Sequence, residues 1–187
     1  MMTVLIRAGL VALLPAAAMG DEVTDAIDAA RKAYDAGDAG AAMDELTYAM
    51  GLLQAMRADG LAAFLPPAPE GWTRETSTEM AGAMAMMGGG TGVEATYASP
   101  GATFSISVMA DSPMLMAMSP MLANPMMLSS SGGKLHRLGD IKAVEMDGSL
   151  MALVANRFLV QAEGAPVETM LPLFGQVDFA GIEGYMP

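Results

Sequence analysis

Apolar residues between residues 22 and 64 recur with the period of an α-helix and predict two antiparallel helices. Between them, Gly37 stands where a helix C-cap favours a left-handed residue, and Asp38 can cap the second helix. We therefore expect a helical hairpin over residues 21–64. The first apolar stripe comprises Val23, Ile27, Ala30 and Tyr34, and the matching stripe of the second helix comprises Met43, Leu46, Met50 and Leu53.

The hairpin resembles one helical pair of the tetratricopeptide type, carried by the run from Ala33 to Asp38 and by Ala42, Leu46 and Ala49. The resemblance covers a single repeat, whereas a stable solenoid needs about three. The pattern therefore favours a local hairpin that packs on the rest of the protein. A peptide-binding array is the alternative.

A proline-rich segment over residues 65–71 marks the predicted domain boundary, because consecutive prolines fix φ and exclude a helix. Trp72, the only tryptophan, is expected to anchor this linker on the following domain, residues 72–187. A capping box from Thr76 to Glu79 then predicts a short helix with Met80, Met84 and Met87 on one face, and the glycine-rich run 88–92 ends it.

The hydrophobic pattern changes to alternation after residue 92 and predicts six strands joined by short turns. Turn signals such as Asp147-Gly148 favour antiparallel pairing of neighbours. Two Ser-Pro starts, at Ser112 and Ser119, predict two short helices between the second and third strands. A last helix is expected from Thr169, with Leu173, Phe174 and Val177 inward. The strand runs are Val93 to Tyr97, Thr103 to Met109, Lys134 to Leu138, Ile141 to Met146, Leu150 to Ala155 and Phe158 to Glu163.

This order of elements predicts an α+β fold, in which the N-terminal helical hairpin precedes an antiparallel β-meander sheet with helices packed on one face.

The first 20 residues have the layout of a cleavable signal peptide. Arg7 closes a short n-region, an apolar stretch from Ala8 to Leu14 follows, and small residues lead to cleavage after Ala18 or Gly20. The apolar stretch is shorter than the roughly 20 residues that a membrane span needs. We therefore predict a periplasmic protein without stable membrane insertion after cleavage.

Composition narrows the possible chemistry. The chain has no cysteine, which excludes disulfides, thiolate metal sites and a cysteine nucleophile. It carries 21 acidic and nine basic residues, a formal net charge of −12. Such a surface repels nucleic acid and anionic lipid, so the expected partner is a protein, a peptide or an apolar ligand.

Several short segments carry a family resemblance. They are Leu65-Pro66, Gly71-Trp72-Thr73, Met86-Met87-Gly88-Gly89-Gly90, Asp111-Ser112-Pro113-Met114, Asn124-Pro125, Gly133-Lys134-Leu135 and Val177-Asp178-Phe179. With these segments, about residues 40–182 of the chain resemble a family of uncharacterised exported proteins of Gram-negative bacteria. The resemblance implies export and a single folded unit, but no activity. The strand order is also similar to that of the photosystem oxygen-evolving P subunit and of Mog1-type proteins, which implies an α+β fold.

Methionine is unusually frequent, with 21 residues, and gathers between residues 80 and 127. Three interpretations are open: adaptable core packing, an exposed apolar binding surface, and a Cu(I) or Ag(I) site, because thioethers are soft, neutral ligands. The binding-surface interpretation uses Met80, Met84, Met87, Met114, Met118 and Met121, and the alternative metal site uses Met114, Met118 and Met121, with Met84 or Met87 as a further ligand.

No catalytic constellation is recognisable in the sequence, and we predict a non-catalytic protein. His136 is the only histidine and is expected on a strand, at the surface or rim. The glycines of the run 88–92 lack the Lys-Ser/Thr of a phosphate-binding loop. The predicted function is therefore binding or interaction in the periplasm, without a cofactor unless copper is bound.

Overall fold

The computed structural model describes residues 17–86, 89–113, 115, 117 and 132–186. The chain divides into two compact units, one up to Leu52 and one from Leu53 onward, which are described separately. Among the helices of these described residues, none is both long enough and apolar enough to cross a membrane.

The first unit is built on the predicted helical hairpin, formed by α1 (Ala17–Asp35) and α2 (Ala39–Ala62), and α2 continues into the second unit. Gly37 adopts a φ of 80°, and its N–H donates to the carbonyl of Tyr34, while the N–H of Asp38 donates to the carbonyl of Ala33. These two bonds form a Schellman motif that ends α1. The Asp38 carboxylate accepts from the N–H of Ala41 at 3.0 Å, so both predicted caps are confirmed.

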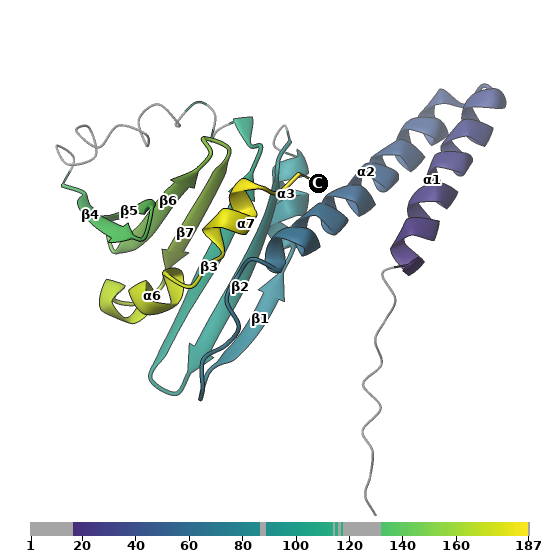
Figure 1. Cartoon of the computed structure of the whole chain (residues 1–187). Coiled ribbons are helices and arrows are strands. Elements are labelled where there is room, and N and C mark those ends of the chain that lie inside the picture. The colour runs from purple at the N-terminus through teal and green to yellow at the C-terminus, as the bar shows by residue number, and fades with distance from the viewer. Residues whose placement is uncertain (1–16, 87–88, 114, 116, 118–131, 187) are drawn as a thin grey trace, which may run out of the picture. The chain divides into compact units, whose positions relative to one another are not determined.

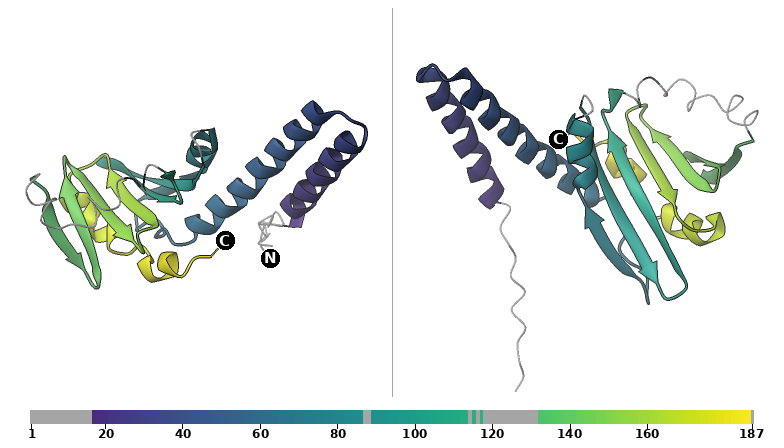
Figure 2. Two further views of the ribbon diagram at one scale, coloured as in Figure 1. Left: turned by 90° about the horizontal axis from the view of Figure 1, so that it is seen from above. Right: turned by 180° about the vertical axis from the view of Figure 1, so that it is seen from behind.

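The two helices of the hairpin pack through small residues, not through the predicted stripes. Figure 2 shows α1 and α2 side by side in both views. Within this hairpin, Val23 and four alanines are buried. The prediction was right for Val23 and Ala30 but wrong for the larger residues, which remain exposed. Small side chains are buried where the two helices lie side by side, and the bulkier side chains lie beside them. The buried alanines are Ala26, Ala30, Ala42 and Ala49.

The second unit contains a seven-stranded, fully antiparallel sheet, which confirms the predicted α+β class (Figure 1). The strand order is β1-β2-β3-β7-β6-β5-β4, so two meanders join where β3 pairs with β7. The strands are β1 (Thr73–Ser77), β2 (Thr91–Ser99), β3 (Ala102–Ala110), β4 (Lys134–Leu138), β5 (Ile141–Met146), β6 (Ser149–Val154) and β7 (Phe158–Glu163).

The alternating pattern predicted β2 to β7 correctly but missed β1. Strand β1 pairs only with β2, and it has the sequence Thr-Arg-Glu-Thr-Ser without one apolar side chain. The predicted capping box overlaps this strand. The short helix α3 (Glu79–Met86) is confirmed, but it begins two residues after the end of β1.

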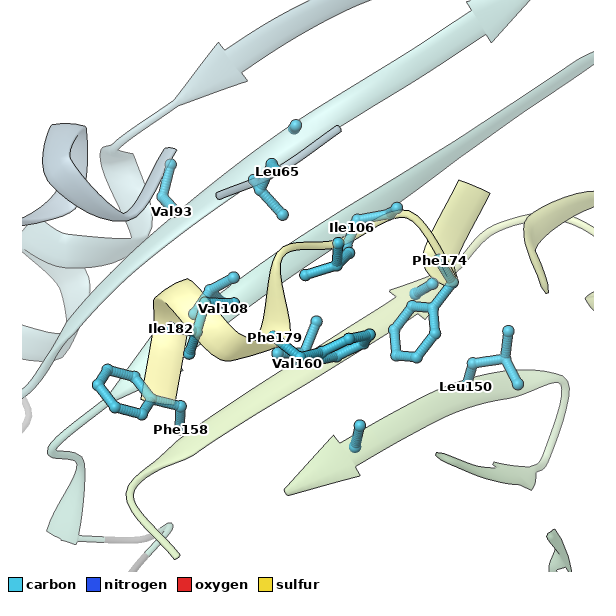
Figure 3. Close-up of a cluster of buried hydrophobic side chains, with 14 of the residues drawn as sticks. Leu65, Val93, Ile106, Val108, Leu150, Phe158, Val160, Phe174, Phe179 and Ile182 are labelled. Atoms are coloured by element: carbon cyan, nitrogen blue, oxygen red, sulfur yellow. The ribbon is translucent and has the colours of Figure 1, made fainter. Parts of the chain in front are cut away.

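One face of the sheet is covered by the end of α2, by α6 (Val167–Phe174) and by α7 (Phe179–Glu183). Alternate residues of the central strands point into this layer and form the core shown in Figure 3. The predicted last helix begins at Val167, two residues before Thr169, so Pro172 lies beyond the first turn. Its predicted inward residues Leu173 and Phe174 are buried as expected, and Val177 is also buried but follows the end of the helix.

The proline-rich segment contributes to this core. Leu65 and Pro66 are buried, and the Tyr97 hydroxyl donates to the Pro66 carbonyl at 2.7 Å. Trp72 meets the ring of Phe104 edge-on at 5.4 Å between ring centroids, which confirms its anchoring role. The two helices predicted from Ser112 and Ser119 lie largely outside the described residues.

Candidate functional site

The most unusual surface among the described residues is an apolar strip on the helical hairpin. Ten large apolar side chains are exposed in the described structure, and eight of them lie between residues 27 and 56, so the exposure is concentrated on these two helices. Within the first unit, five of them define what we call the apolar side. They are Ile27 (47% exposed), Tyr34 (73%), Met43 (68%), Leu46 (49%) and Met50 (60%).

These five residues share one side because of the way the two helices pack. On α1, Ile27 comes one residue after the buried Ala26, and on α2, Met43 comes one residue after the buried Ala42. One residue is a rotation of about 100° around a helix. Because α1 and α2 run in opposite directions, this rotation carries both sets of side chains to the same side of the hairpin.

The apolar side also differs from the rest of the hairpin in charge. Residues 21–52 contain eight acidic and two basic residues. With 3.6 residues per turn, the acidic positions of both helices fall outside the apolar side. One charged residue, Arg31, lies next to the apolar side, one helical turn from both Ile27 and Tyr34. The surface is therefore apolar, bordered by carboxylates, and carries a single positive charge.

The area of this exposed apolar strip is large for a single patch on a soluble protein. Soluble proteins rarely expose a contiguous apolar patch larger than a few hundred Å², and the largest patch of a monomer is often functional. Together the five side chains expose on the order of several hundred Å² per chain. The strip is therefore comparable in area to the largest apolar patch of a typical monomer.

The predicted methionine surface is only partly described. Met80 and Met84, on α3, are half-buried, and their sulfur atoms would lie 2.9 and 3.1 Å from a Cβ placed on Gly92. The missing side chain of Gly92 therefore makes room for the two thioethers against β2. Met87, Met114, Met118 and Met121 lie outside the described residues, so their binding role and the copper alternative stay predictions.

A charged cluster in the second unit joins four segments of the chain. Asp111, in the left-handed region with φ 55°, accepts two hydrogen bonds from Arg157, at 2.6 and 2.8 Å, and one from Arg57 at 2.8 Å. Arg157 also donates to the Tyr185 carbonyl at 3.0 Å, and the Tyr185 hydroxyl donates to the Arg57 carbonyl at 3.0 Å. The hydrogen bonds from Arg157 are the main reason why the pKa of Asp111 lies below its ordinary value of 3.8. These contacts tie α2 to the segments that follow β3, β6 and α7, so the cluster fastens the fold.

His136 lies on the edge strand β4, half-buried, with its Nε2 2.6 Å from the Glu145 carboxylate. Lys134 reaches the same carboxylate oxygen at 3.4 Å. The hydrogen bond with His136 is the largest cause of the lowered pKa of Glu145. This arrangement is a cross-strand charge contact at the rim of the sheet. In the described part of the chain, no three His, Asp or Glu side chains come together as a metal site.

Comparison with known proteins adds no assignment: no family model, no curated protein and no solved structure matches this chain. Sequence reasoning found every residue of the apolar side but placed these residues in the hairpin interior. The sequence does contain a signal for the buried side of the hairpin. It is a second, narrower apolar stripe formed by the alanines Ala26, Ala30, Ala42 and Ala49.

Proposed function

We propose that this chain is an exported, non-catalytic interaction protein that receives a protein partner on the apolar side of its helical hairpin. One observation carries the proposal: five large apolar side chains of one hairpin side are 47–73% exposed, while alanines form the packed interface. Covering these side chains would release the water around them, and this is the main driving force for association.

The spacing on α2 indicates which kind of partner fits. Met43, Leu46 and Met50 are separated by three and four residues, the spacing of a helix seam that packs against another helix. Methionine side chains adapt their shape to a partner because they are unbranched and polarizable. A helical protein surface is therefore the expected counterpart.

Export is the second part of the proposal. It is supported by the charged start, short apolar stretch and small residues before Asp21. We expect intact-mass analysis of protein from the periplasm of a Gram-negative host to show a chain that begins at Met19 or Asp21. A full-length mass that carries residues 1–18 would contradict export by cleavage.

The interaction itself can be tested by site-specific photocrosslinking in cells. We expect a photoreactive benzoylphenylalanine at position 50, on the apolar side, to yield a discrete crosslinked species on denaturing gels. The matched control places the same residue at position 48, because Tyr48 is also exposed on α2 but lies about 160° around the helix from Met50. Position 48 should give no such species.

Either of two results would contradict the proposed function. One is the absence of any crosslinked species from position 50 at native expression. The other is an equal yield from positions 48 and 50, which would show that exposure alone, and not the apolar side, decides the contact.

A further inference from the structure

We infer that the partner on the apolar side is a second copy of this chain, so that two hairpins pair about a two-fold axis into a four-helix bundle. The inference rests on the proposed function, because it names the occupant of the same surface. It is carried by three properties of the hairpin: the self-matching spacing, the distribution of charge and the area of the surface.

The spacing suits a pairing of identical surfaces. In a two-fold contact the same surface patch of both copies meets, with each contact between two residues repeated in the reverse sense, so the patch must match itself. A seam with intervals of three and four residues packs against an identical seam at a shallow crossing angle, as in four-helix bundles. Met43, Leu46 and Met50 supply this seam on α2, and Ile27 and Tyr34 widen it from α1.

The charge distribution restricts how two copies can meet. The chain has a formal net charge of −12, and the hairpin contributes eight acidic residues against two basic ones. Two copies that approached through other sides of the hairpin would oppose carboxylates, which is unfavourable. On the apolar side the charged group is Arg31, which would face the acidic border of the second copy. Charge therefore favours this surface over the other sides of the hairpin.

The available area agrees with a weak but specific dimer. Several hundred Å² from each copy gives on the order of 1,000 Å² in total, which is at the lower limit for a specific protein interface. Interfaces at this lower limit are typically transient, so the dimer should form and dissociate with protein concentration.

Sedimentation equilibrium of the purified chain at several concentrations tests the inference. We expect a monomer–dimer equilibrium, a more than about tenfold weakening by Met50→Glu, and a change below about threefold for the matched control Tyr48→Glu. Leu46→Glu provides a second seam variant. Because all three side chains are exposed, the variants should keep the wild-type helical signal in circular dichroism.

The outcomes separate this inference from the proposed function. A wild-type chain that is monomeric at every concentration, or a dimer that Met50→Glu leaves intact, overturns the second copy as partner. If position 50 still crosslinks in cells, to a chain of different mass, the proposed function stands and only its partner changes. Crosslinking of position 50 to position 50 of another copy supports both.

Discussion

Replacement of Phe158 by alanine is expected to lower the free energy of unfolding by about 3–5 kcal/mol. Phe158 begins β7, is 1% exposed, and points into the core beside Ile182 (Figure 3). The substitution removes most of an aromatic side chain from a position where β3 and β6 flank it on both sides, so the site has little freedom to collapse. It also removes the ring below the Arg157 guanidinium, which lies 4.8 Å from the ring centroid.

Urea unfolding followed by circular dichroism measures this loss. The control is Leu135→Ala, because Leu135 is also a large apolar residue of the sheet but is exposed on the edge strand β4. Its expected cost is below about 1 kcal/mol. Equal costs for the two variants would show that the core of the second unit is not organised around β7.

The second large effect is expected at Asp111. Asp111→Asn should lower the free energy of unfolding by about 1–3 kcal/mol at neutral pH, because both arginines lose their charged acceptor. This loss of stability is modest because about a third of each side chain is exposed to solvent, which screens the ion pairs. Asparagine tolerates the left-handed conformation of residue 111, so the variant removes charge without adding backbone strain.

The difference in unfolding free energy between wild type and Asp111→Asn should become smaller as the pH falls. Because the folded-state pKa lies below the ordinary value of 3.8, the stabilisation is complete above about pH 4 and is lost as the pH falls through the folded pKa. Urea unfolding at a series of pH values should therefore show the difference between wild type and Asp111→Asn narrowing in acid. A difference that stays constant from neutral pH into strong acid would contradict the role of the ionised carboxylate.

The strands could be predicted from the sequence where the alternation of apolar and polar residues agreed with the turn signals. Strands β4, β5 and β7 have the predicted bounds. Between β5 and β6, Asp147 and Gly148 both adopt positive φ, as a tight antiparallel turn requires. Strand β1 could not be predicted in this way, because its stability depends on backbone pairing with β2 and leaves no apolar pattern in its own five residues.

The hairpin shows a different limit of sequence reasoning. Its helices and both caps follow from local chemistry, since Gly37 and Asp38 act on their own neighbours. The choice between two apolar stripes on the same helix is decided by the partner helix instead. Alanine stripes allow closer packing than methionine and leucine stripes, but this advantage exists only when both helices offer one, as Ala30 and Ala42 do here.

The outermost strand β4 has a consequence for the behaviour of the protein at high concentration. Two of its five residues are the cationic Lys134 and Arg137, and it forms one end of the strand order. If two sheets joined along this strand, the same cationic side chains would be brought against each other, and their repulsion would oppose sheet growth. Concentrated solutions should therefore resist the formation of fibres that extend through β4.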